Sequence, residues 1–305
     1  MSLAKTFTSA VTLIHVMQPP RDSGSVHAHD AIAWEIGRQE IEGFLERVRT
    51  RMAAELSEPV DVRIEQGRAA ERIADVAREL SADLTILGSH GEGIGTAWSI
   101  GSTAQAVLAR APTSVFVAHG KRFAEQEGSP KRILVPLDGS RRAETVMPLV
   151  LRLAHEHKAE VILVHIVQEP IHTALLHTKE DNDLLGELAV RLERGAKEYL
   201  NELKKTLVHD VDNVRTIITR HANQQQALLE IAQRESADLV VLSAHGSACD
   251  ASRSFGTLTS HLLTYSSVPL LVLQDLPDSE LSRAQESRSH RSSPPPRTSY
   301  APENV

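Results

Sequence analysis

The stretch ADLTILGSHGEGIGTAWSIGSTA, residues 82–104, decides the fold that this chain can adopt. Its apolar run, Leu84 to Leu87, predicts a buried strand. Small residues with the spacing of a loop and a helix start come after it: Gly88, Gly91, Gly101 and Ser102. Glycine has no Cβ, so such a loop lets the backbone approach a ligand, and free N–H groups near a helix N-terminus favour an anion. The stretch therefore predicts a strand, a phosphate-binding loop and a helix.

The same pattern occurs a second time, as ADLVVLSAHGSACDASRSFGTLT in residues 237–259. Four residues keep the spacing of the first copy: Ser243, Gly246, Gly256 and Thr257. The repeat continues outside the motif, because Val11 and Leu13 recur 150 positions later as Val161 and Leu163. Strands that alternate with helices in both copies predict parallel sheets with helices on both faces and right-handed crossovers. The chain is thus predicted to be a tandem of two α/β domains.

Composition excludes several classes of protein. With 305 residues the chain has room for about two domains that each bury a core. A net charge of -7 and 3% aromatic residues argue against a nucleic-acid partner, which selects for basic patches and stacking platforms. No run approaches the roughly 18 apolar residues of a membrane helix. The single cysteine, Cys249, fits a reducing compartment.

The first residues resemble a secretory signal, because Lys5 precedes the apolar segment TFTSAVTLIHVM. The repeat favours another interpretation. The segment recurs around Val161, deep inside the chain, where no signal could act. We therefore expect a structural strand here and a cytoplasmic protein.

The two halves differ most at their starts. The second half opens with KRILVPLDGS, residues 131–140, which predicts a buried strand ending in Asp138. No counterpart precedes Val11, so the first domain lacks its first strand in this sequence. A start codon placed too late, a truncated gene or another segment that fills the gap would each explain this. In an open parallel sheet the missing strand is central, so its loss would expose two unpaired strand edges.

The paired motifs resemble the nucleotide-binding signature of the universal stress protein (UspA) family, over about residues 8–120 and 132–275. The resemblance implies Rossmann-like (HUP-type) domains, each a parallel five-stranded sheet of order 3-2-1-4-5. We expect the first domain in residues 1–120, a linker in 121–131, the second domain in 132–275 and a disordered tail in 276–305. The tail carries the run Pro294 to Pro296 and few apolar residues.

The resemblance also implies ATP, with or without Mg, at the carboxyl ends of the strands. Asp138 resembles the carboxylate that holds the ribose. The base would be bordered by apolar residues, namely Pro136, Leu137, Ile166 and Leu242. The phosphate loop of the second half would comprise Ser243, Gly246, Gly256, Thr257 and Thr259, although Ser243 stands where the family has a glycine. In the first half the matching residues are Gly88, Gly91, Gly101 and Ser102, without a ribose carboxylate.

The expected function is a nucleotide-binding regulator of the stress response and not an enzyme. No acid, base or electrophile outside the family motif is aimed at a phosphate. A slow ATPase would look alike in sequence. A pure interaction module, in which the glycines only shape a turn, is the other alternative. We expect no metal site of the chain's own. We also expect the last strands, Val115–Ala118 and Leu270–Leu273, to pair as an intramolecular pseudo-dimer, and a homodimer stays open.

Overall fold

The computed structural model describes most of both halves of the chain. The described residues are 2–18, 28–89, 100–119, 129–169, 178–209, 211, 213–248 and 253–276. Three predicted features lie outside them: Gly91, most of the expected linker (residues 121–128), and the tail beyond Leu276.

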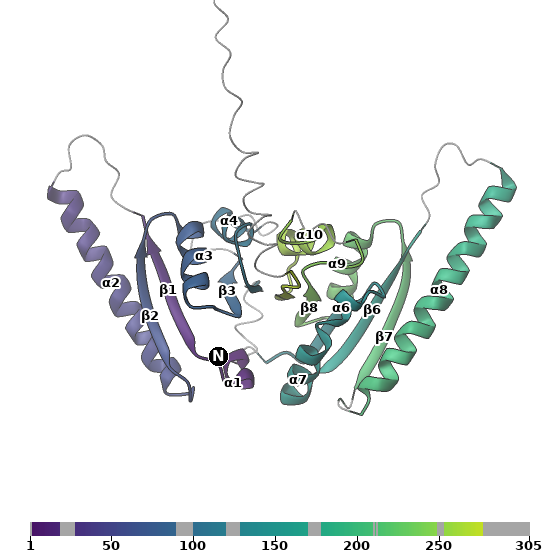
Figure 1. The fold of residues 1–305 in the computed structure, drawn as a ribbon, viewed down its shortest axis with the longest axis horizontal. Coiled ribbons are helices and arrows are strands. Elements are labelled where there is room, and N and C mark those ends of the chain that lie inside the picture. The colour runs from purple at the N-terminus through teal and green to yellow at the C-terminus, as the bar shows by residue number, and fades with distance from the viewer. Residues whose placement is uncertain are drawn as a thin grey trace, which may run out of the picture.

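Strands and helices alternate along the chain, as Figure 1 shows. The first half contains α1 (Ser2–Phe7), β1 (Val11–Met17), α2 (Ala28–Ala53), β2 (Val60–Gln66), α3 (Ala69–Glu79), β3 (Leu84–Gly88), α4 (Ser102–Leu108) and β4 (Ser114–Ala118). The second half contains β5 (Arg132–Pro136), α6 (Arg141–Glu144), α7 (Met147–His157), β6 (Glu160–Gln168), α8 (Lys179–Leu207), β7 (Val214–His221), α9 (Gln224–Arg234), β8 (Leu239–Ser243), α10 (Thr257–Tyr265) and β9 (Leu270–Leu273). The tandem α/β fold is as predicted.

One sheet of seven strands runs through the middle of the molecule, in the order β3-β4-β9-β8-β5-β6-β7. The five strands of the second half are parallel to one another and, counted along the chain, lie in the order 3-2-1-4-5. The two halves join where β4 pairs with β9 in antiparallel register, with Phe116 opposite Leu271. The last strands of the two halves therefore cover each other's edges, as expected from their apolar sequences.

The strands of the first half are divided between two sheets. β1 pairs with β2 in a separate sheet of two strands, whereas β3 and β4 belong to the large sheet. In the second half the position between the corresponding strands, β6 and β8, is taken by β5. The side chains show the difference: Ile86 in β3 is 61% exposed, whereas Val241, which follows it by 155 positions, is 0% exposed.

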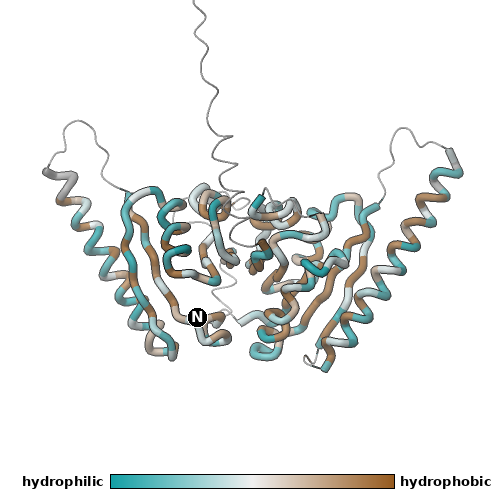
Figure 2. Tube along the Cα trace, viewed as in Figure 1, coloured by the Kyte–Doolittle hydropathy of each residue, from teal (hydrophilic) through white to brown (hydrophobic). Residues whose placement is uncertain are grey.

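The core lies on both faces of the large sheet. One face packs against α9 and α10 through residues such as Leu228 and Leu262, together with Leu134 of the central strand. The other packs against α7 and α8 through residues such as Leu153 and Leu200. Figure 2 shows the hydrophobic residues concentrated in the strands and on the inner sides of these helices. No helix within the described ranges is long and apolar enough to cross a membrane.

The repeat is also visible in the backbone. Thr8 and Lys158 follow the corresponding helices α1 and α7, and both have a φ of 50°. Ser81 and Ser236 form a second such pair, with φ of 49° and 52°. Because L-residues rarely adopt a left-handed conformation, its recurrence at matched positions indicates that both halves follow one backbone plan.

The difference between Ile86 and Val241 can be measured. Replacing Val241 by alanine removes methyl groups from a fully buried site, so we expect a loss of about 1–3 kcal/mol in the free energy of unfolding. Ile86→Ala should change it by less than about 0.5 kcal/mol, because most of that side chain is already in water. Urea unfolding followed by circular dichroism compares the two. Equal losses would contradict the open position between β1 and β3.

Candidate functional site

The predicted site residues of the second half meet at one edge of the sheet. Asp138 follows β5, Ile166 lies near the end of β6, and Ser243 ends β8. Parallel strands place their carboxyl ends at the same edge, which is where open α/β sheets bind ligands. The sequence-distant loops after β5 and β8 are thereby brought into contact.

The carboxylate of Asp138 joins these two loops. Its Oδ1 accepts a hydrogen bond from the Ser140 amide at 2.9 Å, and its Oδ2 accepts one from the Ser247 amide at 2.6 Å. Burial by itself raises the pKa of Asp138, but the hydrogen bonds from Ser140 and Ser247 outweigh it and hold that pKa below its ordinary value. The group is therefore an anion at neutral pH. A carboxylate has about four acceptor positions, more than the two that these amides occupy.

The contact between Asp138 and the Ser247 amide requires a glycine at position 246. A Cβ added at Gly246 would lie 2.3 Å from Oδ2 of Asp138, far closer than van der Waals contact allows. A side chain here would have to displace the carboxylate and break its bond to Ser247. The glycine thus permits a close approach between the loop and Asp138, which is a more specific role than flexibility.

Ser243 and Thr259 turn their hydroxyl groups toward the protein. The Ser243 hydroxyl donates to the His245 carbonyl at 2.5 Å, and the Thr259 hydroxyl donates to the Ser243 carbonyl at 3.1 Å. Both residues are buried, and Ser243 is not among those with positive φ. A serine therefore fits where the family has a glycine. Both side chains hold the backbone of the loop rather than project from it.

The start of α10 has no side-chain cap among the described residues. Ser140, Thr178 and Asn223 cap α6, α8 and α9 with their side chains, whereas α10 begins at Gly256 with no side-chain cap. The exposed Thr257 is the first residue of the helix. The first N–H groups of a helix have no partners within the helix, and an anion satisfies them. The uncapped start of α10, at Thr257, is therefore suited to an anion.

The buried His245, for which the sequence predicted a hydrogen-bonded structural role, holds the loop after β8 through partners that the sequence did not reveal. His245 Nδ1 lies 2.8 Å from Oδ1 of Asp275, and its Nε2 lies 2.9 Å from the Arg253 carbonyl. The ring is thereby held between the Asp275 carboxylate and the Arg253 carbonyl. Arg142 donates to the other carboxylate oxygen of Asp275 at 2.7 Å. Although burial raises the pKa of Asp275, the bonds from His245 and Arg142 hold it below its usual value.

The residues predicted to border the base divide into two groups. Leu137 and Leu242 are 4% and 3% exposed and belong to the core. Pro136 and Ile166 are half-buried at the edge of the sheet and remain accessible. His165 adds a polar group that we did not predict, and its ring lies edge-on to Tyr199. Its buried Nδ1 has no hydrogen-bond partner among the described residues, and burial lowers its pKa despite opposing effects from Leu137 and Asp138.

The first half keeps the frame of the phosphate loop without the carboxylate. The Gly101 amide donates to the Ser89 carbonyl at 2.7 Å, as the Gly256 amide does to the Ala244 carbonyl at 2.8 Å. Gly88 and Ser102 are exposed at the end of β3 and the start of α4. Within the described ranges no strand lies between β1 and β3, so no residue there takes the place of Asp138.

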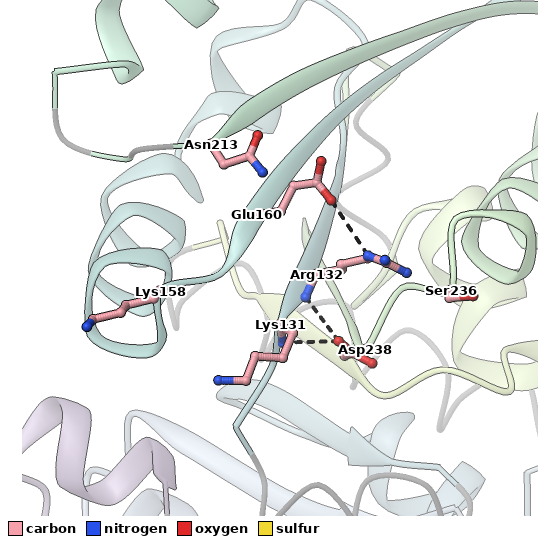
Figure 3. A pocket seen from close by; sticks show the side chains of 7 residues that line it. All are labelled: Lys131, Arg132, Lys158, Glu160, Asn213, Ser236 and Asp238. Atoms are coloured by element: carbon pink, nitrogen blue, oxygen red, sulfur yellow. Dashed lines mark hydrogen bonds and ion pairs between the residues drawn. The ribbon is translucent and has the colours of Figure 1, made fainter.

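A cavity of about 410 Å³ lies elsewhere, at the amino ends of β5 and β6. Figure 3 shows its seven lining residues: Lys131, Arg132, Lys158, Glu160, Asn213, Ser236 and Asp238. The backbone amides of Lys131 and Arg132 each donate to Asp238 Oδ2 at 3.0 Å, and Arg132 lies 3.6 Å from Glu160. Asp238, Arg132 and Glu160 are thus engaged with other lining residues, and the cavity lies at the opposite sheet edge from Asp138. No group of three or more metal-ligating side chains occurs in the part of the chain that the structure describes.

Comparison with known proteins covers both halves of the chain. A model of the universal stress protein family matches residues 1–119 and 130–274. The universal stress protein MJ0577 of Methanocaldococcus jannaschii is 27% identical over 154 residues, which are 47% of this chain and 94% of that protein. A universal stress protein of Mycolicibacterium smegmatis is 24% identical over 280 residues, 89% of each chain.

Solved structures show the same fold over nearly the whole chain. A putative universal stress protein from Pseudomonas aeruginosa has a TM-score of 0.62 at 13% identity and covers 92% of this chain and 99% of its own. A universal stress protein from Archaeoglobus fulgidus has a TM-score of 0.59 at 14% identity and covers 90% of this chain and 91% of its own. At these identities the likeness concerns the fold alone.

The contact between Asp138 and Gly246 leads to a first test of the site. Gly246→Ala should lower the free energy of unfolding by about 1.5–3 kcal/mol, the usual cost of losing a hydrogen bond to a charged group. In an Asp138→Ala background the same change should cost less than about 0.5 kcal/mol, since no carboxylate then opposes the new methyl group. Urea unfolding of the four chains in this cycle measures the coupling. Additive losses in the free energy of unfolding would show that Gly246 and Asp138 are not coupled.

The environment of Asp275 leads to a test with pH. Because its folded pKa lies below its unfolded value of about 4, its contribution to stability is complete above that value and is lost as pH falls through the folded pKa. We expect Asp275→Asn to lose this contribution, so that its free energy of unfolding falls less than that of the parent between pH 5 and pH 3. Glu202→Gln, at a side chain 72% exposed, is the control that should follow the parent. Parallel curves for all three proteins would refute the assignment.

Proposed function

The chain belongs to the universal stress protein family, and we propose that its second half binds one ATP and thereby acts as a regulator in the stress response. One observation carries the proposal: Asp138 and the loop after β8 meet through the Ser247 amide. A ribose carboxylate and a phosphate loop must belong to one site to hold one nucleotide. In this arrangement Asp138 accepts from the ribose hydroxyls, and the phosphates lie toward Gly246 and the start of α10.

The expected position of the base follows from the accessible apolar side chains. Pro136 and Ile166 are the predicted residues that keep exposed surface at this edge. A Mg ion bound with ATP would be held mainly by the phosphates, since Mg²⁺ commonly keeps several waters and few protein ligands.

A regulator is favoured over an enzyme by the way the polar groups are used. Ser243, Thr259 and both ring nitrogens of His245 are engaged in bonds that hold the loop. None of them is left to act as a nucleophile or base toward a phosphate. The chain is proposed to work in the cytoplasm as an intramolecular pseudo-dimer, which the β4–β9 pairing supports. Turnover of ATP by the purified chain would instead favour the slow ATPase.

Binding measurements test the proposed site directly. Isothermal titration of the purified chain with ATP should give one equivalent bound per chain. Asp138→Ala should weaken binding roughly ten- to a hundredfold, because a hydrogen bond to a charged group contributes about 1.5–3 kcal/mol. Gly256→Val should weaken it at least as much. A Cβ at Gly256 meets its nearest protein atom, the Ala244 carbonyl oxygen, at 3.4 Å, so the larger loss would come from the side chain that enters the phosphate site.

The matched control is Gly101→Val, at the corresponding position of the first half. It should leave the ATP affinity nearly unchanged, because no described residue of that half takes the place of Asp138. Two equivalents of ATP per chain, or loss of binding from the Gly101 change alone, would contradict the assignment of the site to the second half. Absence of any binding would favour the interaction module.

A further inference from the structure

We propose that the open edges of β1 and β3 form a docking site for an extended peptide strand with the chemistry of β5. The two edges are defined here as Val11–Ile14 of β1 and Leu84–Leu87 of β3. Among the strands in the described ranges, β1 pairs with β2 alone and β3 with β4 alone. In Figure 1, β1 lies between β2 and β3. Unpaired strand edges carry free N–H and C=O groups that accept another strand.

The second half shows what occupies such a position. There β5 lies between β6 and β8, with Ile133 opposite both Val161 and Leu239. The repeat maps these neighbours onto Val11 and Leu84 of the first half. An entering strand would therefore run parallel to β1 and β3, with its residue equivalent to Ile133 between those two side chains.

On the face of β3 that carries Leu84 and Ile86, an entering strand would need apolar side chains. Ile133 and Val135 of β5 point into the core cluster that also contains Leu239 and Val241. The repeat and the alternation of side chains put Leu84 and Ile86 on the same face of β3. Ile86 is 61% exposed here, whereas Val241 is 0% exposed beneath β5. A strand with two apolar residues at the Ile133 and Val135 positions would bury this surface.

The opposite face gives the site its own selectivity. Leu134 of β5 lies opposite Ile162 and Val240, whereas the matching residues of the first half are Thr12 and Thr85. The Thr85 hydroxyl lies 2.7 Å from that of Thr113. The docking site therefore accepts a polar β-branched residue at the Leu134 position but demands apolar residues on either side of it.

A fused donor strand tests the proposal on the full chain. Residues 130–151 are added directly before Ser2, so that the donor enters the chain as it enters the second half before Arg152. Both tryptophans, Trp34 and Trp98, belong to the first half, and the Trp34 indole donates to the Gln18 carbonyl just after β1 at 3.4 Å. We expect the thermal transition followed by tryptophan fluorescence to rise by about 5 °C or more. Amides of β1 and β3 should exchange with solvent at least about tenfold more slowly.

Matched variants separate docking from a general effect of the added segment. A donor copy with Ile133→Asp and Val135→Asp should give no rise, whereas one with Leu134→Thr should keep most of it. Ile86→Asp should cancel the rise in the fused chain, yet change the unfused chain little. An equal rise with the charged donor, or no rise with the intact donor, would overturn the proposal. So would a protein concentration-dependent rise in the unfused chain, since a second copy would then be the occupant.

Discussion

The hydrogen bond between the Asp138 carboxylate and the Ser247 amide ties together residues 109 positions apart, and the arrangement of the site depends on it. It exists because β5 and β8 are neighbouring parallel strands, whose following loops emerge at the same edge. It also requires Gly246, because any side chain there would occupy the space of the carboxylate. The sheet topology thus sets where the loops meet, and one glycine sets how closely. A nucleotide would bind to a pair of loops that the fold has already brought together.

Buried polar side chains hold the shape of the loop after β8 from the protein side. His245 is clamped between Asp275 and the Arg253 carbonyl, while Ser243 and Thr259 bond to backbone oxygens. Buried polar groups are costly unless they are paired, so a network that satisfies each of them favours one conformation. Rigidity of this kind lowers the ordering cost that binding would otherwise incur. The charge on Asp275 therefore acts on the site through the loop and not by contact.

Sequence reasoning found the parts of the fold that local patterns encode. The glycine spacing and the repeat predicted the tandem α/β fold, and the apolar last strands predicted the pairing of β4 with β9. Asp138 could be identified because it directly follows a buried strand. The clamp on His245 could not, since Asp275 is 30 residues away and is brought near only by β9. Residue type also does not reveal that the Thr259 hydroxyl turns inward, because a threonine at a helix start can face a ligand or the backbone equally well.

The asymmetry between the halves separates two roles that a single domain usually combines. In the second half β5 both fills the centre of the sheet and delivers Asp138 to the ligand edge. The described residues of the first half include neither, yet the Gly101 amide makes the same bond as that of Gly256, and β4 covers the edge of β9. Since β9 leads directly to Asp275 and so to His245, the first half supports the strand from which the clamp is built. A strand docked between β1 and β3 would stabilise that support without adding a second carboxylate, unless the strand itself brought one at its carboxyl end.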